Sequence, residues 1–88
     1  MKSATVARFW RLYRELPVAA REAAREAYRL FDADPSHPGL RFHRLEAHPE
    51  FWSVRVTRDY RAVGLLDKDV ITWFWIGRHA DFDREFPH

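Results

Sequence analysis

The 88-residue sequence contains no cysteine, which excludes disulfide bonds and zinc sites built on thiolates. Its only glycines, Gly39, Gly64 and Gly77, are too scattered to form a phosphate-cradling loop. No apolar stretch reaches the length of a signal peptide or a membrane span. We therefore expect a single domain, residues 1–88, that is cytoplasmic, has no membrane association and carries no cofactor.

Lysine is also scarce, because Lys2 and Lys68 are the only lysines among fifteen basic residues. The other thirteen are arginines, whose planar and permanently charged fork suits phosphate and carboxylate groups. A net charge of +2 is itself a weak electrostatic signal. A general bias in composition explains much of the arginine excess, but it does not explain where individual arginines are placed.

Apolar and aromatic residues are abundant. They make up 47% and 16% of the chain, which is enough for a compact core at this length. The histidines do not share one element with companion carboxylates at metal-ligand spacing, so no metal site is expected. A Ser-His-Asp arrangement is not evident either.

Two helices are predicted in the first part of the chain. Residues 4–16 carry one apolar stripe at helical spacing, formed by Val6, Phe9, Trp10, Tyr13 and Leu16. Residues 18–31 form the second helix, with a narrow alanine-rich apolar face. Pro17 ends the first helix and suits the first turn of the second. The short connection implies an antiparallel helical hairpin.

Four strands are predicted in the second part, at residues 40–45, 51–57, 60–66 and 70–77. In the second of these, Trp52, Val54 and Val56 alternate with polar residues, as in a half-buried strand. The last strand is apolar on both sides, with Trp73 and Trp75 expected on the same face, and we expect a partner segment to cover its second side. Residues 78–88 are expected to form a short helical turn or a tail.

This order predicts an α+β fold in which the two-helix hairpin packs on one face of a four-stranded antiparallel sheet. Within that sheet, Arg55 and Arg61 lie on consecutive strands joined by a tight connection, so we expect them to be neighbours. Such close like charges require an anion between them, or neutralisation by Asp59 or Glu50. Both readings remain open at this stage.

Three tracts together resemble the RelE/ParE superfamily of toxins from type II toxin–antitoxin systems: Ser53-Val54-Arg55-Val56, Tyr60-Arg61-Ala62 and Trp73 to Phe82. The resemblance extends over nearly the whole chain. It implies a cognate antitoxin as partner and a toxin–antitoxin hetero-oligomer. It also implies a first strand before the first helix, which the sequence does not indicate, so one edge strand is expected to be missing.

Ribonuclease members of this superfamily cleave mRNA on the ribosome by activating a ribose 2′-OH against the adjacent phosphate. Without a metal, this reaction needs proton-transfer groups and cations for the phosphate charge. The resemblance assigns catalysis to Arg55, Arg61 and His79, and RNA contacts to Arg58, Arg78 and Phe82. Histidine transfers protons near neutral pH, although His79 is equally well read as a surface residue that closes a strand.

Two departures from the superfamily pattern keep other functions open. Phe82 stands where relatives often have a tyrosine, and arginines replace the strand lysines. Phenylalanine cannot transfer a proton, although it can stack on a base, and arginine is a poor base because it stays protonated. The leading interpretation is a metal-independent endoribonuclease that acts on the ribosome and its mRNA. The alternatives are a non-enzymatic toxin that acts on DNA gyrase and an inactive protein that only binds its antitoxin.

Overall fold

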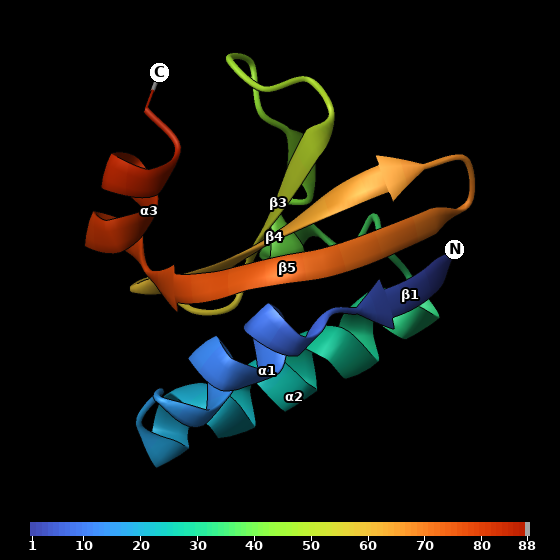
Figure 1. The fold of residues 1–88 in the computed structure, drawn as a ribbon. Coiled ribbons are helices and arrows are strands. Elements are labelled where there is room, and N and C mark those ends of the chain that lie inside the picture. Colours follow the sequence, from blue (N-terminus) through green and yellow to red (C-terminus); the bar gives the residue numbers. More distant parts are fainter. Residues whose placement is uncertain (88) are drawn as a thin grey trace.

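A five-stranded mixed sheet lies between helices in the computed structural model, which describes residues 1–87 (Figure 1). The strand order is β1-β5-β4-β3-β2, with β1 parallel to β5 and the other neighbours antiparallel. The elements in chain order are β1 Lys2–Thr5, α1 Ala7–Arg14, α2 Val18–Ala33, a 3₁₀ turn Pro38–Leu40, β2 His43–Arg44, β3 Phe51–Arg55, β4 Tyr60–Asp67, β5 Val70–Arg78 and α3 His79–Glu85.

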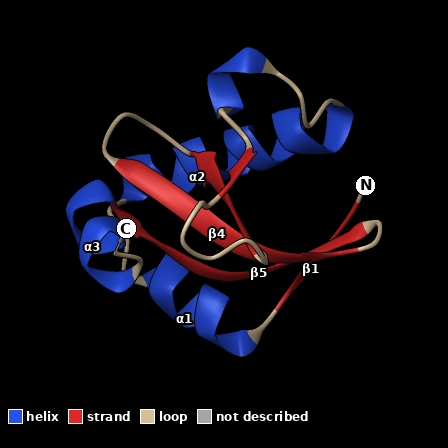
Figure 2. Ribbon diagram, turned by 90° about the horizontal axis from the view of Figure 1, so that it is seen from above, coloured by secondary structure: helices blue, strands red, loops and turns tan. Residues whose placement is uncertain are grey.

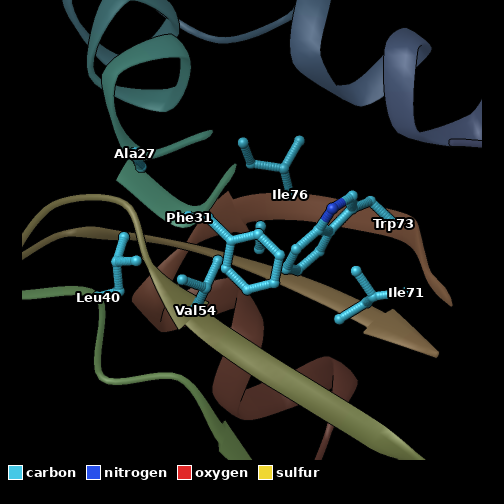
Figure 3. Close-up of a cluster of buried hydrophobic side chains, with 8 residues drawn as sticks. Ala27, Phe31, Leu40, Val54, Ile71, Trp73 and Ile76 are labelled. Atoms are coloured by element: carbon cyan, nitrogen blue, oxygen red, sulfur yellow. The ribbon is translucent and has the colours of Figure 1, made fainter. Parts of the chain in front are cut away.

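The predicted helical hairpin is confirmed, with α1 and α2 side by side beneath one face of the sheet (Figures 1 and 2). The connection contains Pro17, and α2 begins directly after it. A core cluster joins the hairpin to the sheet, and its buried members are Ala27, Phe31, Leu40, Val54, Ala62, Ile71, Trp73 and Ile76 (Figure 3). Within it, the rings of Phe31 and Trp73 meet edge to face at 5.3 Å.

The expected absence of a first strand is wrong. Residues 2–5, partly assigned to the first helix by their sequence, pair with β5 from Lys2 opposite Val70 to Thr5 opposite Trp73. This edge strand is held by backbone hydrogen bonds, such as the one that Lys2 N–H donates to the Asp69 carbonyl at 2.8 Å. Three of its four residues are exposed. It therefore lacks the apolar alternation by which a strand is recognised in sequence.

The two tryptophans of β5 were expected on one face, and this prediction is wrong. Val63 is opposite Trp75, whereas Gly64 is opposite Trp73, so Phe74 is an extra residue in β5. Such a β-bulge shifts the alternation of side chains along the strand. Trp73 consequently belongs to the core beneath the hairpin, and Trp75 belongs to the core on the opposite face.

We expected a partner segment to cover the second face of the sheet. In the structure this face is covered by the chain itself. Helix α3 lies on the side opposite the hairpin (Figure 1). Its apolar side chains join a second core of Leu45, Val63, Trp75, Phe82 and Phe86. At seven residues α3 is too short for a clear helical periodicity, which is why the sequence indicated only a turn or a tail. The last residue of that predicted segment, residue 88, lies outside the described residues.

The remaining strands agree with the sequence to different degrees. β4 and β5 match their predicted ranges closely, while β3 ends at Arg55, two residues early. β2 contains only His43 and Arg44 of the predicted strand 40–45, because the 3₁₀ turn occupies its beginning. Directly after that turn, Arg41 has a left-handed backbone with φ of 46°. No helix of the described chain is long and apolar enough to cross a bilayer.

Candidate functional site

Arg55 and Arg61 lie directly opposite each other across β3 and β4, which confirms that they are neighbours. On its other side Arg61 is opposite Gly77 of β5. Directly opposite residues in antiparallel strands have Cβ atoms about 4.5–5.5 Å apart and share one face of the sheet. By alternation this is the face of Val63 and Trp75, against which α3 packs.

The charges of this pair are not neutralised by Asp59 or Glu50, the two carboxylates considered from the sequence. Across residues 1–87, neither Arg55 nor Arg61 forms an ion pair, and Asp59 and Glu50 do not approach them as counter-ions. Partial burial, reinforced by the nearby guanidinium groups of Arg55 and Arg41, lowers the pKa of Arg61. An uncompensated, partly desolvated cation of this kind favours an anionic ligand.

Arg41 is a member of this cluster that sequence analysis missed. His43 is opposite Ser53 and Arg44 is opposite Trp52. Continuing that register by two residues brings Arg41 opposite Arg55, although residues 41 and 42 are outside the strand proper. Phe42 packs against Trp52 at 4.7 Å on the hairpin side, as this alternation requires. Only the pairing of β2 with β3 reveals this position.

Phe82 supports the pair from α3. Its ring centre is 5.8 Å from Cζ of Arg61, close enough for a cation–π interaction. The ring also packs against Trp75 and Phe86, and only 6% of the residue is exposed. Phe82 was expected to stack on an RNA base, but a ring buried in this way does not present a face to a base. Its position instead suits a support for Arg61.

His79 lies at the beginning of α3, half-exposed beside this cluster. Its backbone N–H donates a hydrogen bond of 2.7 Å to the carbonyl of Asp59, which fixes the start of α3 to the β3–β4 turn. Its Nδ1 lies 3.3 Å from Oδ2 of Asp83, one helical turn later. Asp83 is also the carboxylate that opposes the lowering of the Arg61 pKa. The carboxylate thus lies close to both the imidazole and Arg61.

Two of the other predicted RNA contacts are not brought into this cluster. Arg78 is opposite Tyr60 and next to Gly77 in sequence, so its side chain leaves from the other face. It contacts Asp81 at 3.5 Å. A hydrogen bond from Arg84, followed by the one from Arg78, lowers the pKa of Asp81. Arg58 is exposed in the β3–β4 turn.

A largely apolar groove of about 560 Å³ opens between the helical hairpin and the sheet. It is lined by residues of β1, α1, α2 and the central strands, among them Trp10, Tyr28, Val56 and Trp73. Trp10 and Tyr28 line this groove with rings that are 43% and 52% exposed. The molecule therefore has a basic cluster on one face of its sheet and an apolar groove on the other.

Comparison with known proteins places these features in a family. The fold is similar to that of RelE in the RelB–RelE antitoxin–toxin complex from Methanococcus jannaschii, with TM-score 0.76, 13% identity and coverage of 96% of this chain and 99% of that one. It is also similar to a YoeB/ParE toxin from Agrobacterium tumefaciens, with TM-score 0.68, 17% identity and coverage of 90% and 99%. The isolated Escherichia coli RelE toxin gives TM-score 0.66, 15% identity and coverage of 96% and 94%.

The sequence itself supplies the assignment. No curated protein matches it, but residues 19–84 match the ParE-like toxin domain, which is most of the chain. This range includes the second helix, the antiparallel strands, both arginines of the central pair and His79. The chain therefore belongs to the family of ParE-like toxin domains.

Proposed function

We propose that this protein is the toxin of a type II toxin–antitoxin pair and that it cleaves mRNA on the ribosome without a metal ion. The observation that carries this proposal is the Arg55–Arg61 pair, which forms no ion pair among the described residues, with His79 at the adjacent helix start. Two fixed cations and one proton-transfer group match the needs of phosphodiester cleavage by a ribose 2′-OH.

In the proposed reaction, the ribose 2′-oxygen loses its proton and attacks the adjacent phosphorus. The bond from phosphorus to the 5′-oxygen breaks, leaving a 2′,3′-cyclic phosphate and a 5′-hydroxyl that takes up a proton. We assign one proton transfer to His79, whose imidazole is oriented by Asp83. Arg61 and Arg55 stabilise the charge that builds up on the phosphate oxygens. Phe82 holds the Arg61 guanidinium in place.

The proposed partner is a cognate antitoxin, as suggested by the structural relatives solved as RelB–RelE complexes. The apolar groove is the surface proposed for its apolar segment, because Trp10 and Tyr28 leave large rings open to solvent there. An acidic segment of the same antitoxin would cover the Arg55–Arg61 pair on the opposite face. The double variant Trp10→Ser/Tyr28→Ser should then weaken antitoxin binding by at least tenfold, measured by calorimetry, while leaving cleavage intact.

A second candidate function is action on DNA gyrase without catalysis. It is favoured by the match to the ParE-like toxin domain and by the use of arginine, a poor base, in the central pair. A third candidate is an inactive domain that only binds its antitoxin.

Induction of the protein in cells, followed by primer extension on ribosome-bound mRNA, separates the three. New mRNA ends that are lost in the Arg61→Ala variant support the ribonuclease. Intact mRNA with gyrase-linked DNA breaks supports the second candidate. Unimpaired growth, together with retained antitoxin binding, supports the third.

A further inference from the structure

The arginines that lie across the strands do not end with the Arg55–Arg61 pair, because Arg41 follows beside β2. Arg55 is opposite Arg61, and Arg61 is opposite Gly77. Extending the β2–β3 register by two residues brings Arg41 beside Arg55, and the charge of Arg41 is close enough to contribute to the lowered pKa of Arg61. Three arginines therefore follow one another across neighbouring chain segments on a single face of the sheet. We call the residues Arg41, Arg55 and Arg61 the arginine row. The paired step from Arg55 to Arg61 is about 4.5–5.5 Å between Cβ atoms.

Three properties of the row point to a polyanion. Within residues 1–87, none of the three side chains takes part in an ion pair, and Asp83 acts on Arg61 only from beyond ion-pair distance. The row is graded in burial, from exposed Arg41 to half-buried Arg55 and Arg61. Arg41 also holds a left-handed backbone, which residues other than glycine seldom adopt and which recurs at functional sites.

The number of donors decides what kind of anion fits. Each guanidinium offers five N–H donors and can bind one phosphate bidentately. A single phosphodiester has one charge and two non-bridging oxygens, so it cannot occupy three such forks. We propose that Arg41 is a positioning residue and that the arginine row holds consecutive phosphates of a single-stranded RNA running across β2, β3 and β4. This deepens the proposed function, on which it rests, by assigning a path to the substrate backbone.

The test measures binding and not cleavage, so that it stands apart from the test of the ribonuclease. The probe is a single-stranded oligoribonucleotide with 2′-O-methyl groups at every position, which removes the attacking hydroxyl. The logarithm of its binding constant is measured against the logarithm of salt concentration. For single strands this slope changes by about 0.7 for each phosphate that is neutralised.

The test variant is Arg41→Asn, because asparagine tolerates the left-handed backbone found at this position. Its matched control is Arg44→Asn, which removes the same charge three residues away, from a side chain on the hairpin face opposite Trp52. We expect Arg41→Asn to reduce the magnitude of the slope by about 0.7. When the salt concentration rises fourfold, the factor by which binding weakens should then be about 2.6 times smaller for the variant than for the wild type. Arg44→Asn should leave the slope unchanged, and Arg41→Lys should restore it. The melting temperatures should be equal throughout.

Three results would overturn the proposal. Equal slopes for Arg41→Asn and Arg44→Asn would show a diffuse charge effect without a defined row. A dinucleoside monophosphate that binds as tightly as the oligomer would show a site for one phosphate only. An acidic peptide whose binding depends on Arg41, together with an oligomer whose binding does not, would assign the row to a protein partner alone. Each result holds whether or not the protein cleaves RNA.

Discussion

The guanidinium of Arg61 lies over the ring of Phe82, with 5.8 Å between Cζ and the ring centre. One partner comes from a central strand and the other from α3, so this contact connects the basic cluster to the second core. It stabilises the position of a cation that has no carboxylate within ion-pair distance among the described residues. The contact therefore links the stability of α3 to the geometry of the proposed site.

Replacing Phe82 by leucine tests this link. Leucine keeps the side chain apolar but removes the ring face, so Arg61 loses an interaction of about 0.5–2 kcal/mol. Phe86→Leu is the control, because Phe86 belongs to the same core and is similarly buried, with no cation recorded over its ring. We expect Phe82→Leu to lose more unfolding free energy than Phe86→Leu, by about the size of the cation–π interaction, and we expect weaker RNA binding only in Phe82→Leu. Equal loss of binding in the two would refute a specific role for the ring face.

The proposed roles of Arg61 and His79 differ in their dependence on pH. Arginine remains charged throughout the working range, so Arg61→Ala should slow cleavage by a similar factor at every pH. Histidine changes its charge between pH 5 and 8, so His79→Gln should both slow the reaction and flatten its pH profile. Single-turnover rates on programmed ribosomes measure both effects, with circular dichroism as the check of folding. A pH profile that keeps its shape in His79→Gln would remove His79 from proton transfer.

Trp73 and Trp10 give a matched comparison of stability. Trp73 is 6% exposed in the core beneath the hairpin, whereas Trp10 is 43% exposed at the groove. Loss of a buried ring costs about 3–5 kcal/mol. We therefore expect Trp73→Ala to lower the free energy of unfolding by about this amount, and Trp10→Ala to lower it far less. Chemical denaturation measures both values, and equal losses would show that the position of the bulge is wrong.

Asp81 provides a test of pH dependence in the stability of α3. Its hydrogen bonds with Arg84 and Arg78 lower its pKa in the folded protein. A lowered folded pKa stabilises the protein above the unfolded pKa of about 3.9, and this contribution disappears as the pH falls through the folded pKa. Asp81→Asn should accordingly destabilise the protein slightly at pH 7 and by less at pH 2. Thermal melts at both values measure the difference, and a loss of equal size at pH 2 would contradict it.

The features that sequence predicted correctly are those with a local periodic signal. The second helix, strands β4 and β5, and the adjacency of Arg55 and Arg61 all follow from helical spacing, strand alternation and a short turn. What sequence missed depends on distant contacts. β1 is a strand only because β5 lies beside it, and Arg41 joins the basic cluster only through the pairing of β2 with β3.

The bulge at Phe74 illustrates the same limit in a different way. Alternation assumes that every residue of a strand has one partner, and it therefore placed Trp73 and Trp75 together. One unpaired residue reverses that assignment. Gly64 lies opposite the bulge, where a Cβ would come within 2.7 Å of the Ile71 side chain and 3.0 Å of the Trp73 ring. An isolated glycine in an apolar strand was the available signal.

The pairing of β1 with β5 has a consequence for how the protein is made. Lys2 is opposite Val70, so β1 can pair with β5 only after most of the chain has been synthesised. His79 and Phe82 follow later still, on α3. Contacts between residues so far apart in sequence carry a large loop-closure entropy and form slowly. We therefore expect the pairing of β1 with β5 and the docking of α3 to be late steps of folding, so that the proposed site is completed after the β3–β4–β5 meander.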